Sequence, residues 1–231
     1  MRFLLASKSP ARRATLVSAG ITPIVRVSDI DEDLVLANFC ARSAGAPSPG
    51  DQVTTLADAK CGAVISGLVD GTITIDEAHC ERLLVVACDS MLLQDGQMLG
   101  KPHTAEVARE RIRAFRGSEA ILWTGHSAAL VERDPSTPLG SYALIARTHA
   151  STSTIVRFGS MSDAEIDAYV DSGEPLHVAG SFTIDGLGGP FIAGVDGDHH
   201  NVVGISLPLV HTMAEEVGVF WPDLWDHRQP R

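Results

Sequence analysis

Strand-like and helix-like segments alternate along the sequence, and this alternation predicts an α/β fold with flanking helices around a sheet. Short apolar runs at residues 2–6, 24–27 and 83–87 are typical of buried strands, and the longer runs 120–132 and 142–158 also predict strands. Neither an internal repeat nor a long linker interrupts the 231 residues. We therefore expect one domain that covers residues 1–231.

Helix signals stand between these strands. Ser9 and Pro10 form an N-cap and first-turn pair for a helix that is expected to stop at Gly20. Further helices are expected at residues 53–65, 104–115 and 205–216, and Ser162 with Glu165 has the spacing of a capping box. A hairpin is predicted at residues 91–99, around an Asp-Gly turn. Residues 38–50, 67–81 and 134–140 are rich in Gly, Pro, Ser or charge, so we expect loops or insertions there.

Charge and cysteine usage restrict the class of protein. The net charge of −11 argues against a protein that wraps a nucleic-acid backbone, although a local basic pocket for a small anion remains compatible with it. Asp89 interrupts the most apolar run, residues 83–93, so no membrane span is expected. The four cysteines have no C-x-x-C spacing, which favours idle thiols in a reducing cytoplasm over zinc or disulfides.

The segment from Ser7 to Arg13 lies at a predicted strand-to-helix junction. Free N–H groups at a helix N-terminus favour a phosphate, and the hydroxyl of Ser7 and the guanidinium groups of Arg12 and Arg13 could add charge-assisted bonds. The alternative is that Ser9 only caps the helix while both arginines are solvated. The segment lacks the glycines of a P-loop.

Asp89 follows the apolar run 83–87, at the position where α/β folds often expose their chemistry. A carboxylate there could hold a divalent metal or accept a proton from water. Lys101, between Gly100 and Pro102, could reach a phosphate as a point charge. The alternative is that Asp89 is an ordinary turn carboxylate.

Two further segments have residue types that are typical of binding sites. The acidic run 28–33, which contains Glu32, offers the oxygen ligands that Mg²⁺ or Mn²⁺ prefers, although such a run is more often a solvated loop. Lys60 by itself is expected to be an exposed helix lysine. The glycine-rich stretch 173–204 indicates close backbone approaches. Within it, His199 and His200 would point to opposite sides of a strand, so a shared metal ion is not expected.

Taken together, these segments resemble the Maf family of nucleotide pyrophosphatases. The resemblance rests on motifs that occur in order over nearly the whole chain: residues 5–13 (L-A-S-K-S-P-A-R-R), Asp31-Glu32, residues 56–60 (L-A-D-A-K), residues 88–90 (C-D-S), residues 99–102 (L-G-K-P), Thr124-Gly125, residues 165–169, residues 173–175 (G-E-P), Ala179-Gly180 and residues 201–204 (N-V-V-G).

The resemblance implies a single elongated domain with a central mixed sheet, flanking helices and a cleft between two lobes. It implies cleavage of a nucleoside triphosphate to the monophosphate and pyrophosphate with a divalent metal such as Mg²⁺, Mn²⁺ or Co²⁺. It also implies a homodimer. Asp89 takes the family's general-base position and, with Glu32, a metal-contacting one; the substrate- or phosphate-contacting positions fall on Ser7, Arg12, Lys60 and Lys101, with Arg13 as a weaker candidate.

The sequence departs from the family pattern in ways that affect substrate choice. Ala11 takes the place of the first arginine after Pro10, and the insertions at residues 38–50 and 67–81 have no counterpart in a compact member. Asp185 stands where the pyrimidine-preferring branch has a glutamine. An ionised carboxylate only accepts hydrogen bonds, which suits the adjacent donors of guanine or 7-methylguanine. The alternative is that Asp185 only caps the turn at Gly186.

A second function class stays open at this stage. A protein with this resemblance could sense nucleotides and regulate cell division by binding rather than by turnover. The joint presence of Glu32, Asp89 and Lys101 favours the enzyme, because a sensor would not need a base.

Overall fold

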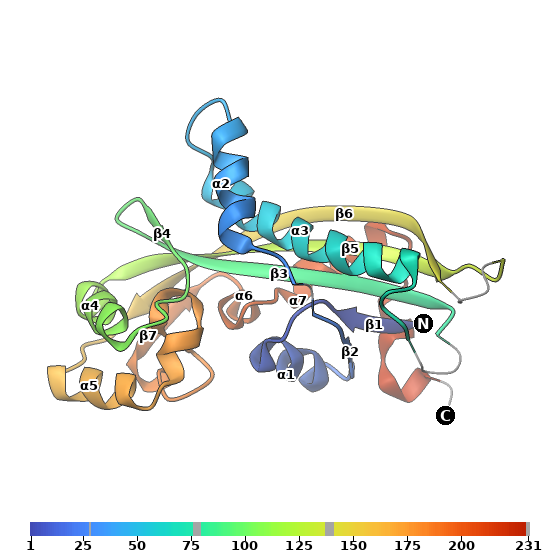
Figure 1. Ribbon diagram of the computed structural model, residues 1–231. Helices are drawn as coiled ribbons and strands as arrows, with labels where there is room; N and C mark the ends of the chain where they lie inside the picture. Colours follow the sequence, from blue (N-terminus) through green and yellow to red (C-terminus); the bar gives the residue numbers. More distant parts are fainter. Residues whose placement is uncertain (28, 76–79, 137–140, 230–231) are drawn as a thin grey trace. The chain divides into compact units, whose positions relative to one another are not determined.

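The computed structural model describes residues 1–27, 29–75, 80–136 and 141–229, and it has an α/β architecture (Figure 1). In chain order the helices and strands are β1 (Arg2–Leu5), α1 (Pro10–Ser18), β2 (Ile24–Val25), α2 (Glu32–Arg42), α3 (Pro49–Asp70), β3 (Arg82–Gln94), β4 (Gln97–Leu99), α4 (Ala105–Phe115), β5 (Glu119–Arg133), β6 (Tyr142–Phe158), α5 (Asp163–Asp171), β7 (Ile192–Asp196), α6 (His199–Val203) and α7 (Leu207–Glu216). Short 3₁₀ turns follow two of the helices. Three lie between α5 and β7: η1 (Glu174–His177), η2 (Ala179–Ser181) and η3 (Gly189–Phe191); two follow α7: η4 (Trp221–Leu224) and η5 (Asp226–Arg228). The predicted fold class is confirmed.

The strands form a mixed sheet in the order β2-β1-β3-β5-β6-β7, and β4 pairs with β3. β1 runs parallel to both β2 and β3, whereas the β3–β4 and β6–β7 pairs are antiparallel. The β3–β4 hairpin turns at Asp95 and Gly96, which both have positive φ (47° and 78°), as a tight two-residue hairpin turn requires. The predicted Asp-Gly hairpin is therefore confirmed.

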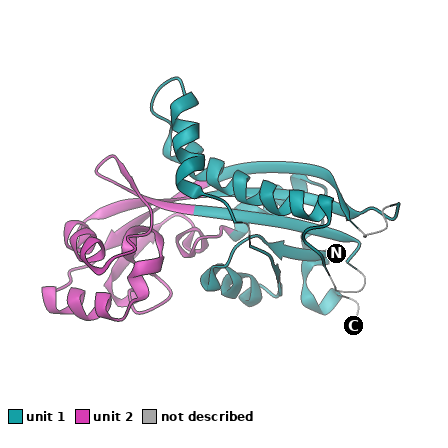
Figure 2. Cartoon of the chain, in the orientation of Figure 1, with its two compact units in different colours: residues 1–89, 125–151, 207–231 teal, residues 90–124, 152–206 magenta. Residues whose placement is uncertain are grey.

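The chain divides into two compact units, which Figure 2 shows in different colours. Unit 1 comprises residues 1–89, 125–151 and 207–231, and unit 2 comprises residues 90–124 and 152–206. β3, β5 and β6 each contribute residues to both units. The single-domain organisation stays a prediction.

The core of unit 1 forms where α3 packs on the sheet. Successive residues of a strand point to opposite faces, so the odd-numbered residues of β3 from Leu83 to Ala87 share one face. With Ala129 and Val131 of β5 they join the buried cluster that contains Cys61, Val64, Ile65 and Leu68 of α3. Asp89 continues the same series on β3, and the packing of α3 against this face is what brings a helix side chain toward it.

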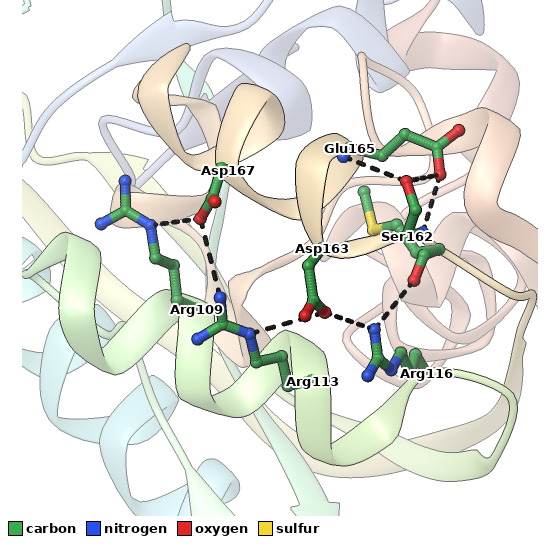
Figure 3. Close-up of polar contacts among 8 residues, drawn as sticks. Arg109, Arg113, Arg116, Ser162, Asp163, Glu165 and Asp167 are labelled. Carbon is green, nitrogen blue, oxygen red and sulfur yellow. Dashed lines mark hydrogen bonds and ion pairs between the residues drawn. The ribbon is translucent and has the colours of Figure 1, made fainter.

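Unit 2 has its own core, in which Phe158 and Phe115 stack at a ring-centroid distance of 4.2 Å. Ion pairs join α4 to α5 on the surface of this unit: Arg109 Nε lies 2.9 Å from Asp167 Oδ1, and Arg116 Nη1 lies 2.6 Å from Asp163 Oδ1 (Figure 3). Ser162 caps α5 with the predicted capping box. These ion pairs are partly or fully exposed to solvent, so each stabilises the fold by at most about 1 kcal/mol.

Several sequence predictions about loops were wrong. Residues 38–50 are not one loop, because α2 extends to Arg42 and α3 begins at Pro49. The side chains of Asp31 and Ser48 accept hydrogen bonds from backbone N–H groups and so start these two helices. The predicted loop 67–81 is helical up to Asp70. Residue 28 of the acidic run, residues 76–79 of this segment and residues 137–140 of the third predicted loop lie outside the described residues.

Other differences concern the type and length of elements. His199 and His200 lie in α6 rather than on a strand. β3 continues without a break through residues 88–90, and β2 is limited to two residues. Among the helices that the structure describes, none has the length and apolar character needed to cross a membrane.

Candidate active site

Asp89 is a buried carboxylate on β3, with 7% of its surface exposed. It follows a strand segment in which residues 83–88 are fully buried. A carboxylate in such a place needs a cationic partner, because burial without one disfavours the ionised form strongly.

Lys60 of α3 supplies this partner. Its Nζ lies 2.5 Å from Asp89 Oδ1 and 3.0 Å from Glu32 Oε1, and its side chain is 13% exposed. The expectation that Lys60 would be an exposed helix lysine if taken alone was wrong: the lysine lies between two carboxylates that come from different elements.

Glu32 occupies the first turn of α2, where a carboxylate also interacts favourably with the helix dipole. Its side chain is 44% exposed, so Glu32 is the more solvent-accessible of the two carboxylates that contact Lys60. Its neighbour Asp31 has a structural task, because Asp31 Oδ1 accepts a hydrogen bond from the backbone N–H of Leu34. The acidic run therefore combines a helix cap with a residue that belongs to the site.

The pKa of Asp89 is raised above its ordinary value. Burial is the largest cause, the positive charges of Lys60 and Arg12 oppose it, and the negative charge of Glu32 adds to it. A raised pKa makes a carboxylate a stronger proton acceptor than a solvated one, provided that it is ionised at the working pH. The arrangement thus suits a general base.

Ser7 and Arg12 form the second part of the site. Arg12 Nη1 donates to Ser7 Oγ at 3.1 Å and to the carbonyl oxygen of Cys88 at 2.8 Å, which fixes the guanidinium beside the residue that precedes Asp89. Ser9 accepts from the backbone N–H of Arg12 and caps α1, as predicted. Arg13 is exposed on the same helix. Adjacent residues of a helix are about 100° apart around its axis, so the side chains of Arg12 and Arg13 leave the helix in different directions.

The donor set is compatible with a hard divalent cation. Two carboxylates, Glu32 and Asp89, converge on the single cationic group of Lys60. Among the residues that the structure describes, no group of three or more His, Cys, Asp or Glu side chains gathers as a metal site. Mg²⁺ is commonly held by one or two carboxylates together with substrate phosphates and water, so two carboxylates fit this mode of binding.

Lys101 and Asp185 belong to unit 2. Lys101 is exposed, and the loop that carries it is fixed because Gly100 O accepts hydrogen bonds from Arg111 Nη1 at 2.7 Å and from the backbone N–H of Gly180 at 3.3 Å. Asp185 is exposed in the loop between η2 and η3. Of the sequence-predicted residues, the structure thus brings together Ser7, Arg12, Glu32, Lys60 and Asp89 within unit 1.

Glu174 organises the loop that carries Asp185, a role that was not predicted from its place in the G-E-P motif. Its carboxylate accepts hydrogen bonds from Thr183 Oγ1 at 2.5 Å and from the backbone N–H groups of Leu187 and Gly188 at 3.1 and 3.2 Å. Partial burial raises the pKa of Glu174, but these hydrogen bonds outweigh it and hold the pKa below its ordinary value. The N–H groups of a glycine-rich loop need acceptors, so the glycine-rich sequence itself could have indicated a carboxylate in this role.

Comparison with known proteins agrees with the motifs in the sequence. The model of the Maf-like protein family matches residues 2–217. A nucleoside triphosphate pyrophosphatase of Saccharopolyspora erythraea is 46% identical over 226 residues, which cover 97% of each chain. Proteins with the same name from Rhodococcus jostii (46% identity, 96% of this chain and 95% of the relative) and Cutibacterium acnes (45% identity, 97% and 94%) are similar over comparable lengths. The chain belongs to the Maf-like protein family.

Proposed function

We propose that this protein is a nucleoside triphosphate pyrophosphatase that cleaves the bond between the α- and β-phosphates. The observation that carries the proposal is the buried Asp89, which lies 2.5 Å from Lys60 Nζ, together with Glu32 on the same lysine. The names of relatives that are 45–46% identical over nearly the whole chain support the same activity.

In the proposed reaction, Asp89 accepts a proton from a water molecule as the water oxygen forms a bond to the α-phosphorus. The bond from the α-phosphorus to the bridging oxygen breaks, and that oxygen leaves with pyrophosphate, so the products are a nucleoside monophosphate and pyrophosphate. Lys60 and Arg12 lie near Asp89 and would stabilise the negative charge that develops on the phosphates. Ser7 keeps Arg12 in place through its hydroxyl.

Glu32 and Asp89 would hold a divalent cation such as Mg²⁺, Mn²⁺ or Co²⁺. When bound, the ion would neutralise phosphate charge and lower the pKa of a coordinated water. Asp89 would orient a water molecule toward the phosphorus. Lys60 has three N–H donors, two of which face Asp89 and Glu32, so one would remain for a phosphate oxygen.

Further parts of the proposal concern residues outside this group. Lys101 and Arg13 contribute positive charge for the polyphosphate. Asp185 reads the base and favours guanine-type nucleotides over dTTP, because an ionised carboxylate accepts from adjacent N–H donors.

The protein acts in the cytoplasm, where a reducing environment suits its four free cysteines. It forms a homodimer, and light scattering would measure this oligomeric state.

The experiment is an incubation of the purified protein with a panel of nucleoside triphosphates, 7-methyl-GTP included, with each of the three metal ions. Chromatography separates monophosphate plus pyrophosphate from diphosphate plus phosphate. We expect equal amounts of monophosphate and pyrophosphate, loss of activity with EDTA and recovery when Mg²⁺ or Mn²⁺ is restored. Nucleotide binding without any product would instead favour a nucleotide-sensing regulator.

A further inference from the structure

Arg147 of β6 forms a set of bonds to α3 that the proposed chemistry does not use. Its Nη2 lies 2.6 Å from Asp58 Oδ1 and donates to the backbone carbonyl oxygen of the same residue at 2.5 Å. Ser127 of β5, which is fully buried, donates to Asp58 Oδ1 at 2.9 Å. One helix residue is therefore held by side chains of two neighbouring strands.

The position of this contact on the helix is informative. Residues of an α-helix are separated by about 100° around the axis, so Asp58 and Gly62 point in nearly the same direction. A Cβ added at Gly62 would lie 3.4 Å from Arg147 Nη1, which shows that the guanidinium lies along this flank of α3. Lys60 is about 200° from Asp58 and thus lies on the opposite flank.

Between the two flanks, α3 turns its apolar face to the sheet. Ala57, Cys61 and Val64 are fully buried. Apolar packing of this kind is tolerant of small rotations of a helix about its axis, because it has no direction of its own. The contacts of Asp58 on one flank and of Lys60 on the other are directional, and together they fix this rotation.

We propose that Arg147 and Asp58, with Ser127, are positioning residues that hold α3 in the rotation at which Lys60 meets Asp89. This inference rests on the proposed function, because it assigns a catalytic consequence to the Lys60–Asp89 pair. Arg147 and Asp58 act on the reaction only through Lys60. The guanidinium of Arg147 matters beyond its charge, because its Nη2 binds the carboxylate and the backbone carbonyl oxygen of Asp58 while its Nε donates to Ser127 Oγ at 3.4 Å.

The first test is a double-mutant cycle on kcat. Arg147→Met lowers kcat on the order of tenfold in the wild-type background, since a small misplacement of a catalytic group is sufficient for such a loss. In a Lys60→Met background the same substitution has less than about a twofold effect, because the residue it positions is absent. Arg147→Lys retains part of the activity, because it keeps the positive charge. Arg157→Met serves as the matched control.

Arg157 suits this purpose because it lies on the same strand and forms an ion pair at 2.8 Å, but with Glu119 rather than with a residue of α3. Arg157→Met is expected to leave kcat within about twofold of wild type, as for most exposed ion pairs. An equal loss of kcat from Arg147→Met in both backgrounds, or no loss in the wild-type background, would overturn the proposal.

The second test does not depend on activity. Acetylation of the Lys60 amine by acetic anhydride, followed by peptide mass spectrometry, reports how well Lys60 is held, with the exposed Lys8 as internal reference. In Arg147→Met the rate at Lys60 relative to Lys8 rises by about threefold or more, because the helix samples other rotations. An unchanged ratio rejects the positioning role even in an active enzyme. A wild-type protein that releases no pyrophosphate rejects the proposed function, and the labelling ratio still decides the role of Arg147.

Discussion

Arg12 and Arg13 are adjacent in α1, but their side chains have different surroundings. Arg12 is bonded to Ser7 and to the carbonyl oxygen of Cys88, whereas Arg13 is exposed. We predict that Arg12→Ala lowers kcat/KM by about 10- to 100-fold, the value of one or two charge-assisted hydrogen bonds. Arg13→Ala is the matched control and should lower it far less. Equal losses in steady-state kinetics of the two variants would contradict this difference.

The next prediction concerns Asp185 and the nucleotide base that the protein prefers. We predict that wild type has a higher kcat/KM for 7-methyl-GTP than for dTTP, and that Asp185→Gln shifts this ratio toward dTTP. An amide both donates and accepts, which matches the N3–H group and carbonyls of thymine, whereas an ionised carboxylate only accepts. If the ratio stays the same in Asp185→Gln, the side chain does not contact the base and only caps the turn at Gly186.

At the scale of elements, the close approach of β5 to α3 depends on Gly125. A Cβ at this position would overlap the backbone of Val53 and Thr54 in the first turns of α3. We predict that Gly125→Ala lowers the free energy of unfolding by about 1–3 kcal/mol, as overpacking usually does. Chemical denaturation would measure this loss. Gly194→Ala is the control, because a Cβ at Gly194 meets no atom within 4 Å; equal effects of the two substitutions would contradict the account.

The loop between η2 and η3 gives a prediction about pH. The pKa of Glu174 is lowered in the folded protein, so its ionised form stabilises the fold above the ordinary carboxyl pKa. This contribution is lost as the pH falls through the folded-state pKa. Glu174→Gln should therefore cost about 1 kcal/mol near neutral pH, a value reduced by partial exposure. The difference from wild type in urea unfolding should shrink at acidic pH; a constant difference would be contrary evidence.

The sequence predicted elements with a strong apolar pattern or clear caps, such as β1, α1 and the β3–β4 hairpin. It missed α2, and the structure gives the physical reason: none of the residues of this helix is buried, so no apolar stripe marks it. Its local signals are limited to the cap at Asp31, the acidic residues of the first turn and Arg42 in the last turn. Helix propensity without burial is a weak signal in a sequence.

Much of the candidate site was predicted from motifs, but its internal pairing was not. Asp89 and Lys60 are 29 positions apart, and only the packing of α3 on the sheet brings their side chains together. Local patterns contain no information on such a contact, so Lys60 was expected to be solvated when taken alone. The same reason explains why Glu174 and Arg147 had no predicted role: their partners lie 9 or more positions away.

At the scale of the whole molecule, the charge distribution agrees with a small anionic substrate. The chain has a net charge of −11, yet Arg12 and Lys60 are gathered beside Asp89. A local pair of cations is sufficient for a polyphosphate, whereas a nucleic-acid backbone requires an extended basic surface. The acidic remainder of the surface favours solubility and does not determine the fold.

The proposed role of Asp89 as general base is tested by the substitution Asp89→Asn. The amide has nearly the same shape and removes a buried charge, while Lys60 keeps Glu32 as a partner, so the fold should survive. We predict that kcat for pyrophosphate release falls by about 10² or more, with little change in thermal unfolding and with nucleotide binding retained in calorimetry. A well-folded Asp89→Asn protein that releases pyrophosphate at the wild-type rate would contradict the account.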